Sequence, residues 1–324
     1  MKALQRKFLL SVVLWAANAG LVCSLGQEFP QGPITLVVPF AAGSGTDQTA
    51  RAMAQSMSEE FNTTVVIDNR GGANGLLAAQ YVAQAKPTGY TLLLTTNTTQ
   101  VANQYLYKKL PYDPVKDFQP IGLIGRGSMF LVVNPSSQIT TVDELLKAAR
   151  SRPGKLNFGS GSSSSRVGSE LLKQMAKIDV TSVPYKSNPQ AVNDLMGGQI
   201  DYMFLDSSTA LPLIHAGRLQ PLAVSAATRS NAAPLVPTVA EAGLPGFEVT
   251  YWNAVYAPAG VAPDIVDKLA KMISGAALSK RMVLRQESLG GEAVTSTPSE
   301  LAEYQAREVR TWGRIIRAAG IEPE

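Results

Sequence analysis

Short apolar runs alternate along the chain with stretches of helical periodicity. The run Ile34–Val38 predicts a strand, and Ala50, Met53 and Met57 then recur at the spacing of one helix face. The alternation continues through further predicted strands and helices, which are Thr64–Ile67, Leu76–Ala85 and Thr91–Leu94. Strands that alternate with helices are typical of β-α-β units, so the pattern predicts an α/β protein with a mainly parallel sheet.

A second α/β body is predicted after the loop Lys108–Pro114, which is rich in proline and charge. Its predicted elements are Phe130–Val133, Val142–Arg150, Leu156–Phe158, Arg166–Met175, Ile200–Phe204 and Leu222–Ser225. A return with three prolines follows between residues 231 and 246. The chain therefore has the pattern of two α/β halves joined by loops.

The last predicted helix is amphipathic. Leu301, Trp312 and Ile316 lie on its apolar face, and the opposite face carries four arginines, which are Arg307, Arg310, Arg314 and Arg317. We interpret the arginines as a solvated face, with a docking surface as the alternative.

The first 26 residues predict a secretory signal peptide. Lys2, Arg6 and Lys7 precede the apolar run Phe8–Ala17, and small residues suited to cleavage follow. Cleavage at Ser24–Gly26, which makes Gln27 the first mature residue, is favoured over cleavage at Ala17–Ala19. A lipid anchor on Cys23 is the less favoured alternative, because Val22 before it is not a small residue.

The charge of the mature chain argues against nucleic-acid binding. The whole chain has 29 basic and 25 acidic residues, and three of the basic residues lie in the predicted signal peptide. The remaining 26 basic and 25 acidic residues leave a net charge of +1. A nucleic-acid binder needs a concentrated positive field for its phosphate contacts. The one cysteine also rules out an intrachain disulfide.

The strongest candidate for chemistry is the loop Phe40–Asp47, between the first strand and the first helix. Its glycines, Gly43 and Gly45, allow backbone N–H groups to face a cleft, and the helix start adds partial positive charge. The loop therefore suits an anion. An equally favoured interpretation is a tight turn. In this turn Thr46 caps the helix, and the negative charge of Asp47 interacts favourably with the helix dipole.

The same loop also resembles part of a dinucleotide fingerprint. Gly43-Ser44-Gly45 follows a strand, and Asp68 ends the next strand, where such folds place a ribose-binding acid. The third glycine of that motif is Gln48 here. We give this reading little weight and interpret Asp68 as a capping carboxylate.

A second candidate loop, Gly159–Arg166, also lies between a strand and a helix. Small residues leave its amides accessible, serine hydroxyls add donors, and Arg166 offers a planar fork to a carboxylate. The alternative is a flexible linker followed by a helix cap. Two such loops, one in each half, favour a ligand held between the halves.

Catalytic and metal chemistry find little support in the sequence. His215 is the single histidine, and a surface or core role is more typical of its helical setting than a catalytic base. There is no G-x-S-x-G elbow, no H-E-x-x-H motif and no cysteine pair for zinc. We therefore predict no enzyme activity, no cofactor and no metal site.

Seven segments of the mature chain, in order, closely resemble the Bug-type receptors, the extracytoplasmic solute-binding proteins of tripartite tricarboxylate transporters. They are Pro33–Asp47, Asp68–Gly75, Leu110–Phe118, Pro153–Phe158, Val183–Lys186, Leu195–Asp201 and Val236–Gly243. The resemblance implies a two-lobed α/β periplasmic binding protein of type II, a Venus flytrap with its ligand cleft between two α/β domains. The expected domains are residues 27–127 with 253–324, and residues 128–252.

The resemblance also implies a set of ligand-binding residues. They are Phe40, Ala41, Ala42, Gly43, Ser44, Gly45, Thr46, Asp47, Thr96, Asn97, Thr98, Ser160, Gly161, Ser162, Ser163, Ser164, Ser165, Arg166, Tyr185, Phe204 and Asp206. Two positions depart from the family pattern: Ser44 stands for the usual glycine, and Arg166 replaces a common histidine.

The implied function is capture of a small carboxylate in the periplasm and its delivery to a membrane permease, by a protein that we expect to be a monomer. The ligand class stays open among dicarboxylates, tricarboxylates, amino acids and aromatic acids. An apolar wall of Phe40 and Trp252 would favour aromatic or branched acids, whereas Asp47 or Asp206 facing the cleft would favour a ligand with a hydrogen-bond donor. A strand-end turn is the favoured role of Asp206. The alternative functions are a periplasmic enzyme and a dinucleotide-binding protein that uses Gly43-Ser44-Gly45.

Overall fold

The computed structural model describes residues 29–288 and 290–323. Contacts within the chain separate Met1–Gln31 from one compact unit, Gly32–Glu324, and the fold described below is that of the second unit. The predicted signal peptide, with Cys23 and both cleavage sites, lies outside the described residues.

The first part of the fold is a small parallel sheet with crossover helices. Strand β1 (Ile34–Val38) pairs in parallel with β2 (Val65–Asn69) on one side and β3 (Thr91–Thr96) on the other. Helices α2 (Gly45–Phe61) and α3 (Leu76–Ala83) make the crossovers. Ala50, Met53 and Met57 are fully buried, which confirms the predicted apolar face of α2.

The second part repeats this arrangement. Its strands are β5 (Asn157–Ser160), β6 (Thr181–Pro184), β7 (Tyr202–Asp206) and β8 (Gln220–Val224). Its helices are α5 (Val142–Ser151), α6 (Ser163–Ala176), α7 (Asn188–Met196) and α8 (Ser207–His215). Strand β5 pairs in parallel with β6 and β7.

Two long strands join the parts, and they correct one prediction. Strands β4 (Phe118–Val133) and β9 (Thr250–Pro258) run antiparallel to each other and to their other neighbours. The sheet is therefore mixed, and the prediction of a mainly parallel sheet was wrong. A β-α-β pattern implies parallel pairing only where a helix crosses over, and long loops lead into β4 and β9 instead.

The pairing of β4 changes partner partway along the strand. Its residues up to Ser128 pair with β9, and its residues from Met129 onward pair with β7 and β8. The complete strand order is β2-β1-β3-β9-β4-β7-β5-β6, with β8 and β10 also paired to β4. One continuous strand thus belongs to both parts of the sheet.

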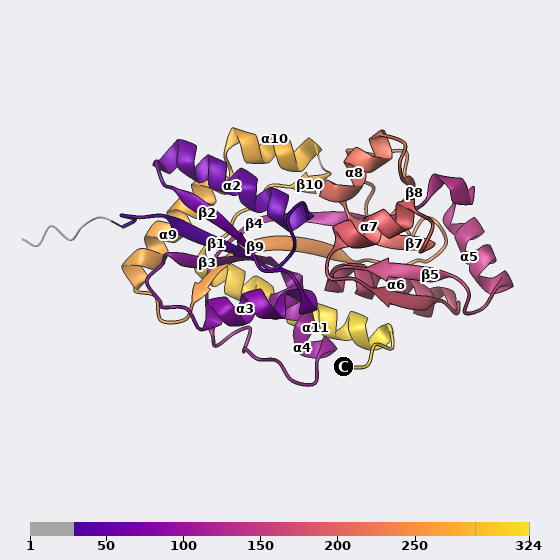
Figure 1. Cartoon of the computed structure of the whole chain (residues 1–324), viewed down its shortest axis with the longest axis horizontal. Helices are drawn as coiled ribbons and strands as arrows, with labels where there is room; N and C mark the ends of the chain where they lie inside the picture. Colours follow the sequence, from indigo (N-terminus) through magenta and orange to yellow (C-terminus); the bar gives the residue numbers. More distant parts are fainter. Residues whose placement is uncertain (1–28, 289, 324) are drawn as a thin grey trace, which may run out of the picture. The chain divides into compact units, whose positions relative to one another are not determined.

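The remaining elements complete the fold around these strands. They are η1 (Ala73–Gly75), η2 (Thr98–Ala102), α4 (Asn103–Leu106), η3 (Pro135–Ser137), α9 (Pro263–Ala277), α10 (Lys280–Ser288), β10 (Gly291–Glu292) and α11 (Pro298–Ala318). Figure 1 shows α2 and α10 on one side of the strands and α3, α4 and α11 on the other. No helix in the described ranges is both long enough and apolar enough to cross a bilayer.

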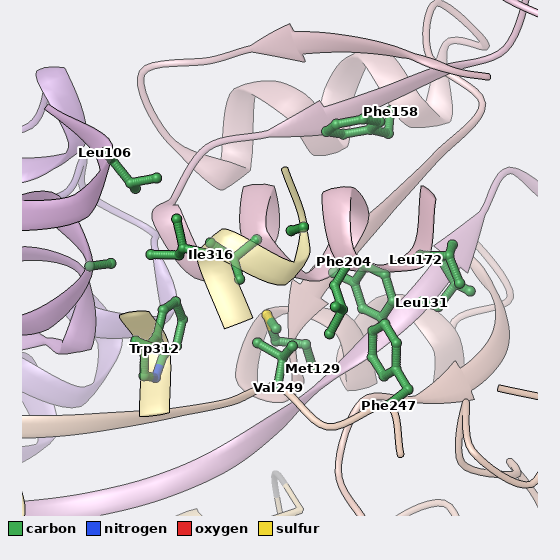
Figure 2. Packing of buried hydrophobic residues seen from close by; sticks show 14 of the residues in the cluster. Leu106, Met129, Leu131, Phe158, Leu172, Phe204, Phe247, Val249, Trp312 and Ile316 are labelled. Carbon is green, nitrogen blue, oxygen red and sulfur yellow. The ribbon is translucent and has the colours of Figure 1, made fainter. Parts of the chain in front are cut away.

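Helix α11 is the predicted amphipathic last helix. It begins with a capping box, because the Thr297 side chain accepts from the Glu300 amide and Glu300 accepts from the Thr297 amide. Its Trp312 and Ile316 are buried in one cluster with residues of β4, α4 and α6, such as Leu106, Met129 and Leu172. Figure 2 shows side chains of this cluster, including the stacked rings of Phe204 and Phe247, whose centroids lie 5.5 Å apart.

Replacing Ile316 tests how much the docking of α11 contributes to the fold. Ile316 is 2% exposed, so Ile316→Ala leaves a cavity and should lower the free energy of unfolding by about 2 to 5 kcal/mol. Leu235 is 91% exposed, and Leu235→Ala should change it by less than about 0.5 kcal/mol. Urea titration of both variants measures the difference, and equal losses would show that α11 is not part of the core.

Candidate ligand-binding site

A cavity lies where the starts of α2, α6 and α8 come together with β9 and the end of β3. It holds about 520 Å³ of empty space, part of it open to solvent. Its lining residues are Phe40, Ser44, Gly45, Thr46, Thr49, Thr96, Thr98, Met129, Gly161, Ser162, Ser164, Asn188, Asp206, Ser208, Tyr251 and Asn253. Both glycine- and serine-rich loops of the sequence therefore reach one cavity.

The start of α2 leaves two backbone amides without an acceptor. Ser44 is the cap residue: its hydroxyl accepts from the Asp47 amide at 3.2 Å, and its carbonyl accepts from the Gln48 amide at 2.9 Å. None of the hydrogen bonds of the described chain uses the amides of Gly45 and Thr46, and both residues line the cavity. Amides of a first helical turn extend from the N-terminal end of the helix. The residue that caps α2 is therefore Ser44, and the alternative prediction that Thr46 caps the helix was wrong.

Asp47 turns away from the cavity. Its Oδ2 accepts from the Gly43 amide at 2.8 Å and from Arg51 Nε at 3.0 Å. Burial opposes ionisation, but these hydrogen bonds outweigh it and hold the pKa of the Asp47 carboxyl below its usual value. Gly43, whose amide is used here, does not line the cavity, and neither do Ala41 and Ala42.

The start of α6 repeats the geometry of α2. The Ser162 hydroxyl accepts from the Ser165 amide at 3.3 Å, and the Gly161 amide donates to Asn188 Oδ1 at 3.1 Å. The amides of Ser163 and Ser164 have no acceptor in the described part of the chain. Two helix starts with the same serine cap therefore bring unpartnered amides to one cavity, where Gly45, Thr46 and Ser164 line it and Ser163 lies just behind the lining.

Side chains behind the lining hold the start of α6 in place. Ser164 Oγ donates to Asn97 Oδ1 at 3.3 Å, and Ser163 Oγ donates to Asn103 Oδ1 at 3.2 Å. Ser165 Oγ donates to the Phe204 carbonyl at 2.6 Å. Among the predicted residues, Asn97, Ser160, Ser163, Ser165 and Phe204 lie outside the lining.

Thr98 offers a buried hydroxyl with no partner. Its amide donates to Thr96 Oγ1 at 3.1 Å, at the first residue of the π-helical turn η2. The Thr98 side chain is fully buried, lines the cavity, and its Oγ1 makes no hydrogen bond. An unpaired buried hydroxyl is unfavourable, so a ligand atom that pairs with it gains free energy.

Asp206 lines the cavity and also caps α8. Its Oδ1 accepts from Ser208 Oγ at 2.7 Å and from the Thr209 amide at 3.0 Å, and its Oδ2 accepts from Asn188 Nδ2 at 3.2 Å. Among the described residues that line the cavity, it is the only charged one. A Cβ added to Gly45 would overlap Asp206 Oδ1 and Ser208 Oγ, so α2 and α8 approach each other through this glycine.

Two of the predicted residues, Tyr185 and Arg166, also lie outside the lining. The Tyr185 hydroxyl donates to Asp194 Oδ2 at 2.6 Å, and burial together with this bond raises the pKa of Tyr185 to about 12. Trp252 is buried, and its Nε1 donates to Glu308 Oε2 at 3.1 Å instead of facing the cavity. The apolar part of the lining is Phe40 and Met129.

Six lining residues lie outside the set that the sequence predicts: Thr49, Met129, Asn188, Ser208, Tyr251 and Asn253. Ser208 lies two residues after the predicted site residue Asp206, and Asn188 lies two residues after the motif that ends at Lys186. The sequence therefore indicated the neighbourhood of both residues but not the residues themselves. Tyr251 and Asn253 lie on β9, an element that the pattern did not predict. Burial raises the pKa of the Tyr251 hydroxyl, which lies 3.2 Å from Ser207 Oγ.

The chemistry of the lining suits an anion with a carbon chain. Amides, hydroxyls and the asparagine side chains supply hydrogen bonds, and no lysine, arginine or histidine lines the cavity. No group of three or more His, Cys, Asp or Glu side chains placed to hold a metal occurs among the described residues. His215 is exposed at the end of α8, and Asp68 pairs with Arg70 at 2.7 Å, so neither residue belongs to the cavity.

Comparison with solved structures defines the class of fold. The chain is similar to the periplasmic binding protein BugD, with 31% identity, a TM-score of 0.87, and coverage of 91% of this chain and 100% of BugD. It is also similar to Rpa4515 of R. palustris with adipate, with 34% identity, a TM-score of 0.89, and coverage of 92% and 100%. The fold is that of the periplasmic binding proteins, which confirms the predicted fold class.

The family of the chain follows from its sequence. The model of the tripartite tricarboxylate transporter family receptor matches residues 49–321, and the chain belongs to this family. Protein BugT of Bordetella pertussis is 32% identical over 96% of this chain and 97% of BugT. The family consists of solute-binding receptors, which confirms that the chain is a receptor and not an enzyme.

Gly45→Ala tests the close approach of α2 and α8. The added methyl group would overlap the side chains of Asp206 and Ser208, and such overpacking costs about 1 to 3 kcal/mol. We expect ligand affinity to fall by about tenfold or more in isothermal titration calorimetry. Gly32→Ala is the control, because nothing lies within 4 Å of its added Cβ. Equal affinity of both variants would contradict this role of Gly45.

Thr98→Val tests the unpartnered hydroxyl. Removing it should leave the melting temperature of the ligand-free protein unchanged or raised, and should weaken a charged ligand by about 1.5 to 3 kcal/mol. Thr209 is the matched control, because its Oγ1 is also buried without a partner but does not line the cavity. If Thr209→Val weakens the ligand as much as Thr98→Val, the hydroxyl of Thr98 is not a ligand contact.

Proposed function

We propose that this receptor binds a small dicarboxylate between the starts of α2 and α6. The observation that carries the proposal is the pair of serine-capped helix starts with the unpartnered amides of Gly45, Thr46 and Ser164 at one cavity. Each helix start is suited to one carboxylate, because its amides and its partial positive charge favour an anion. The adipate of the similar protein Rpa4515 supports this class of ligand.

The free energy of these contacts is of the right order for a transport receptor. A hydrogen bond to a charged group contributes about 1.5 to 3 kcal/mol. The three amides of Gly45, Thr46 and Ser164 thus supply roughly 4.5 to 9 kcal/mol before the losses of association. Micromolar affinity requires about 8 kcal/mol. Because association costs at least about 4 kcal/mol, Thr98 and the other polar and apolar groups of the lining must contribute as well.

The rest of the lining selects among dicarboxylates. Phe40 and Met129 supply an apolar surface for the carbon chain of the ligand. Asp206 repels an additional carboxylate and accepts a hydrogen bond from a hydroxyl or ammonium group on that chain. We therefore expect dicarboxylates to bind more tightly than tricarboxylates.

The two-lobed organisation supports capture by closure. We propose lobes of residues 27–127 with 253–324, and of residues 128–252. The change of partner along β4, from β9 at Ser128 to β7 at Met129, supports the first boundary. Contacts of Ser164 with Asn97 and of Gly45 with Asp206 then join the lobes at the ligand, as expected for a hinged receptor.

We propose that the receptor is exported to the periplasm and serves a membrane permease. The signal peptide predicted for residues 1–26 supports export, and membership of the tripartite transporter receptor family supports a permease partner. We expect the receptor to be a monomer, which suits a protein that diffuses between ligand and permease.

A thermal-shift screen tests the proposed function. The chain from Gln27 to Glu324, refolded to remove retained ligand, is melted with di- and tricarboxylates, amino acids, aromatic acids and NAD. A ligand at 100 times its dissociation constant adds about 2.7 kcal/mol to the free energy of unfolding. We expect a selective shift with a dicarboxylate such as adipate.

The panel also contains the outcomes that would contradict the proposal. A shift with NAD alone would favour the dinucleotide reading of Gly43-Ser44-Gly45. A shift only with monocarboxylates or amino acids would contradict the two-carboxylate arrangement. Consumption of the ligand during the assay would contradict a receptor.

A further inference from the structure

Helix α11 carries a groove lined by arginines that the proposed ligand site does not use. The groove holds about 880 Å³ of open space. Its lining residues are Tyr105, Arg307, Arg310, Thr311, Arg314 and Arg317. The four arginines are exposed, and no acidic side chain lines the groove.

These four arginines lack the ion pairs that many other arginines in the described part of the chain form with carboxylates. Five arginines form ion pairs with carboxylates, which are Arg51–Asp47, Arg70–Asp68, Arg126–Glu292, Arg229–Glu241 and Arg281–Glu59. None of the ion pairs found in residues 29–288 and 290–323 involves an arginine of the groove. Arg307 lies with its guanidinium 5.7 Å from the centre of the Tyr304 ring, and its charge also acts on Glu308.

The spacing of the arginines works against the stability of the helix. Arg307 and Arg310 are three residues apart, Arg310 and Arg314 are four apart, and Arg314 and Arg317 are three apart. Like charges at these spacings are neighbours on a helix and repel each other. A structural role would pair them with acids, as Glu59 pairs with Arg281. The repulsion is relieved when an anionic partner binds.

The length of the groove indicates an extended partner. Residues 307 to 317 span about 15 Å of helix at 1.5 Å per residue. An extended segment of about five residues has this length. A small carboxylate cannot contact all four guanidinium groups at once. Guanidinium groups match carboxylates in a bidentate geometry, so acidic side chains at successive positions fit the groove.

A membrane surface fits the groove less well. A helix that binds a bilayer inserts an exposed apolar face next to its basic face. The apolar residues of α11, Leu301, Trp312 and Ile316, are buried in the core instead. The groove therefore has the charge for a membrane but lacks the apolar surface that would enter it.

The position of α11 connects the groove to both sides of the cavity. Gln305 Nε2 donates to the carbonyls of Gln100 and Pro114 at 3.0 Å, which ties the helix to η2, the turn that carries Thr98. Trp312 and Ile316 pack in the same cluster as Leu171 and Leu172 of α6, the helix that begins at the cavity. A partner in the groove therefore contacts the helix on which both η2 and α6 rest.

We propose that the α11 arginine groove binds an acidic segment of the membrane partner of this receptor. The inference rests on the proposed function, because it takes a permease as the partner. Both η2, which carries the cavity residue Thr98, and α6, which begins at the cavity, rest on α11, so the groove lies next to elements that reach the ligand site.

The test measures binding of a labelled peptide of eight glutamates to the mature chain by fluorescence anisotropy. Arg310→Gln with Arg314→Gln should weaken the peptide by about threefold or more, since an exposed ion pair contributes little by itself and two are lost together. The control pair, Arg229→Gln with Arg281→Gln, removes the same charge from arginines that are already paired and should change affinity less than about twofold.

Further measurements separate this proposal from other roles of the arginines. The melting temperature of the Arg310/Arg314 variant should be unchanged or raised, and a lowered value would indicate a structural role instead. Vesicles with 30% phosphatidylglycerol should bind more weakly than the peptide; stronger binding to them would overturn the proposal in favour of a membrane surface. Dimerisation that the variant abolishes would overturn it in favour of a second copy.

The peptide result is independent of the ligand site. The thermal shift with adipate should be the same in the Arg310/Arg314 variant and in the parent chain, because neither arginine lines the cavity. Absence of that shift in every variant would contradict the proposed function and leave the peptide result intact. Equal weakening of the peptide by both arginine pairs would overturn the groove proposal and leave the ligand site intact.

Discussion

The site depends on backbone amides that the fold itself cannot pair. Every helix leaves its first N–H groups without an intrahelical acceptor, and folded proteins rarely leave such groups buried and unsatisfied. In α2 and α6 a serine cap accepts the third amide of the helix, and the amides before it remain without an acceptor. Because both helix starts meet at one cavity, the unpaired donors gather where an anionic ligand completes their hydrogen bonds. The binding chemistry is therefore a consequence of how two helices begin.

The rest of the fold holds those two helix starts against each other. Strand β4 runs through both parts of the sheet, and β9 pairs along its first part. Helix α11 packs on η2 and α6 and so bridges the two sides of the cavity. Gly45 allows α2 to approach Asp206, which caps α8 and lines the same cavity. Strands β4 and β9, helix α11 and Gly45 thus each hold the two parts of the fold together at the cavity.

Much of the first part of the fold was predictable from the hydrophobic pattern. Ile34–Val38 and the buried face of α2 follow directly from apolar spacing. The direction of β4 and β9 was not predictable, because no crossover helix precedes them and apolar periodicity does not encode strand direction. In the site, Ser44, Gly45 and Ser162 were predictable as loop residues before helices. The side of the loop that faces the cavity was not predictable. The Gly43 amide donates a hydrogen bond to Asp47 Oδ2, and only the folded loop shows this contact. Residues such as Tyr251 and Asn253 reach the cavity from a distant strand, so local sequence carried no signal for them.

Amide chemical shifts test the central claim most directly. In a nitrogen-15 NMR titration of the mature chain with adipate, the amides of Gly45, Thr46 and Ser164 should show large shifts as they gain an acceptor. The amide of Gly43 is the internal control, because Asp47 already accepts from it and Gly43 does not line the cavity, and its shift should stay small. A titration in which adipate raises the melting temperature while those three amides stay unchanged would contradict binding by the two helix starts.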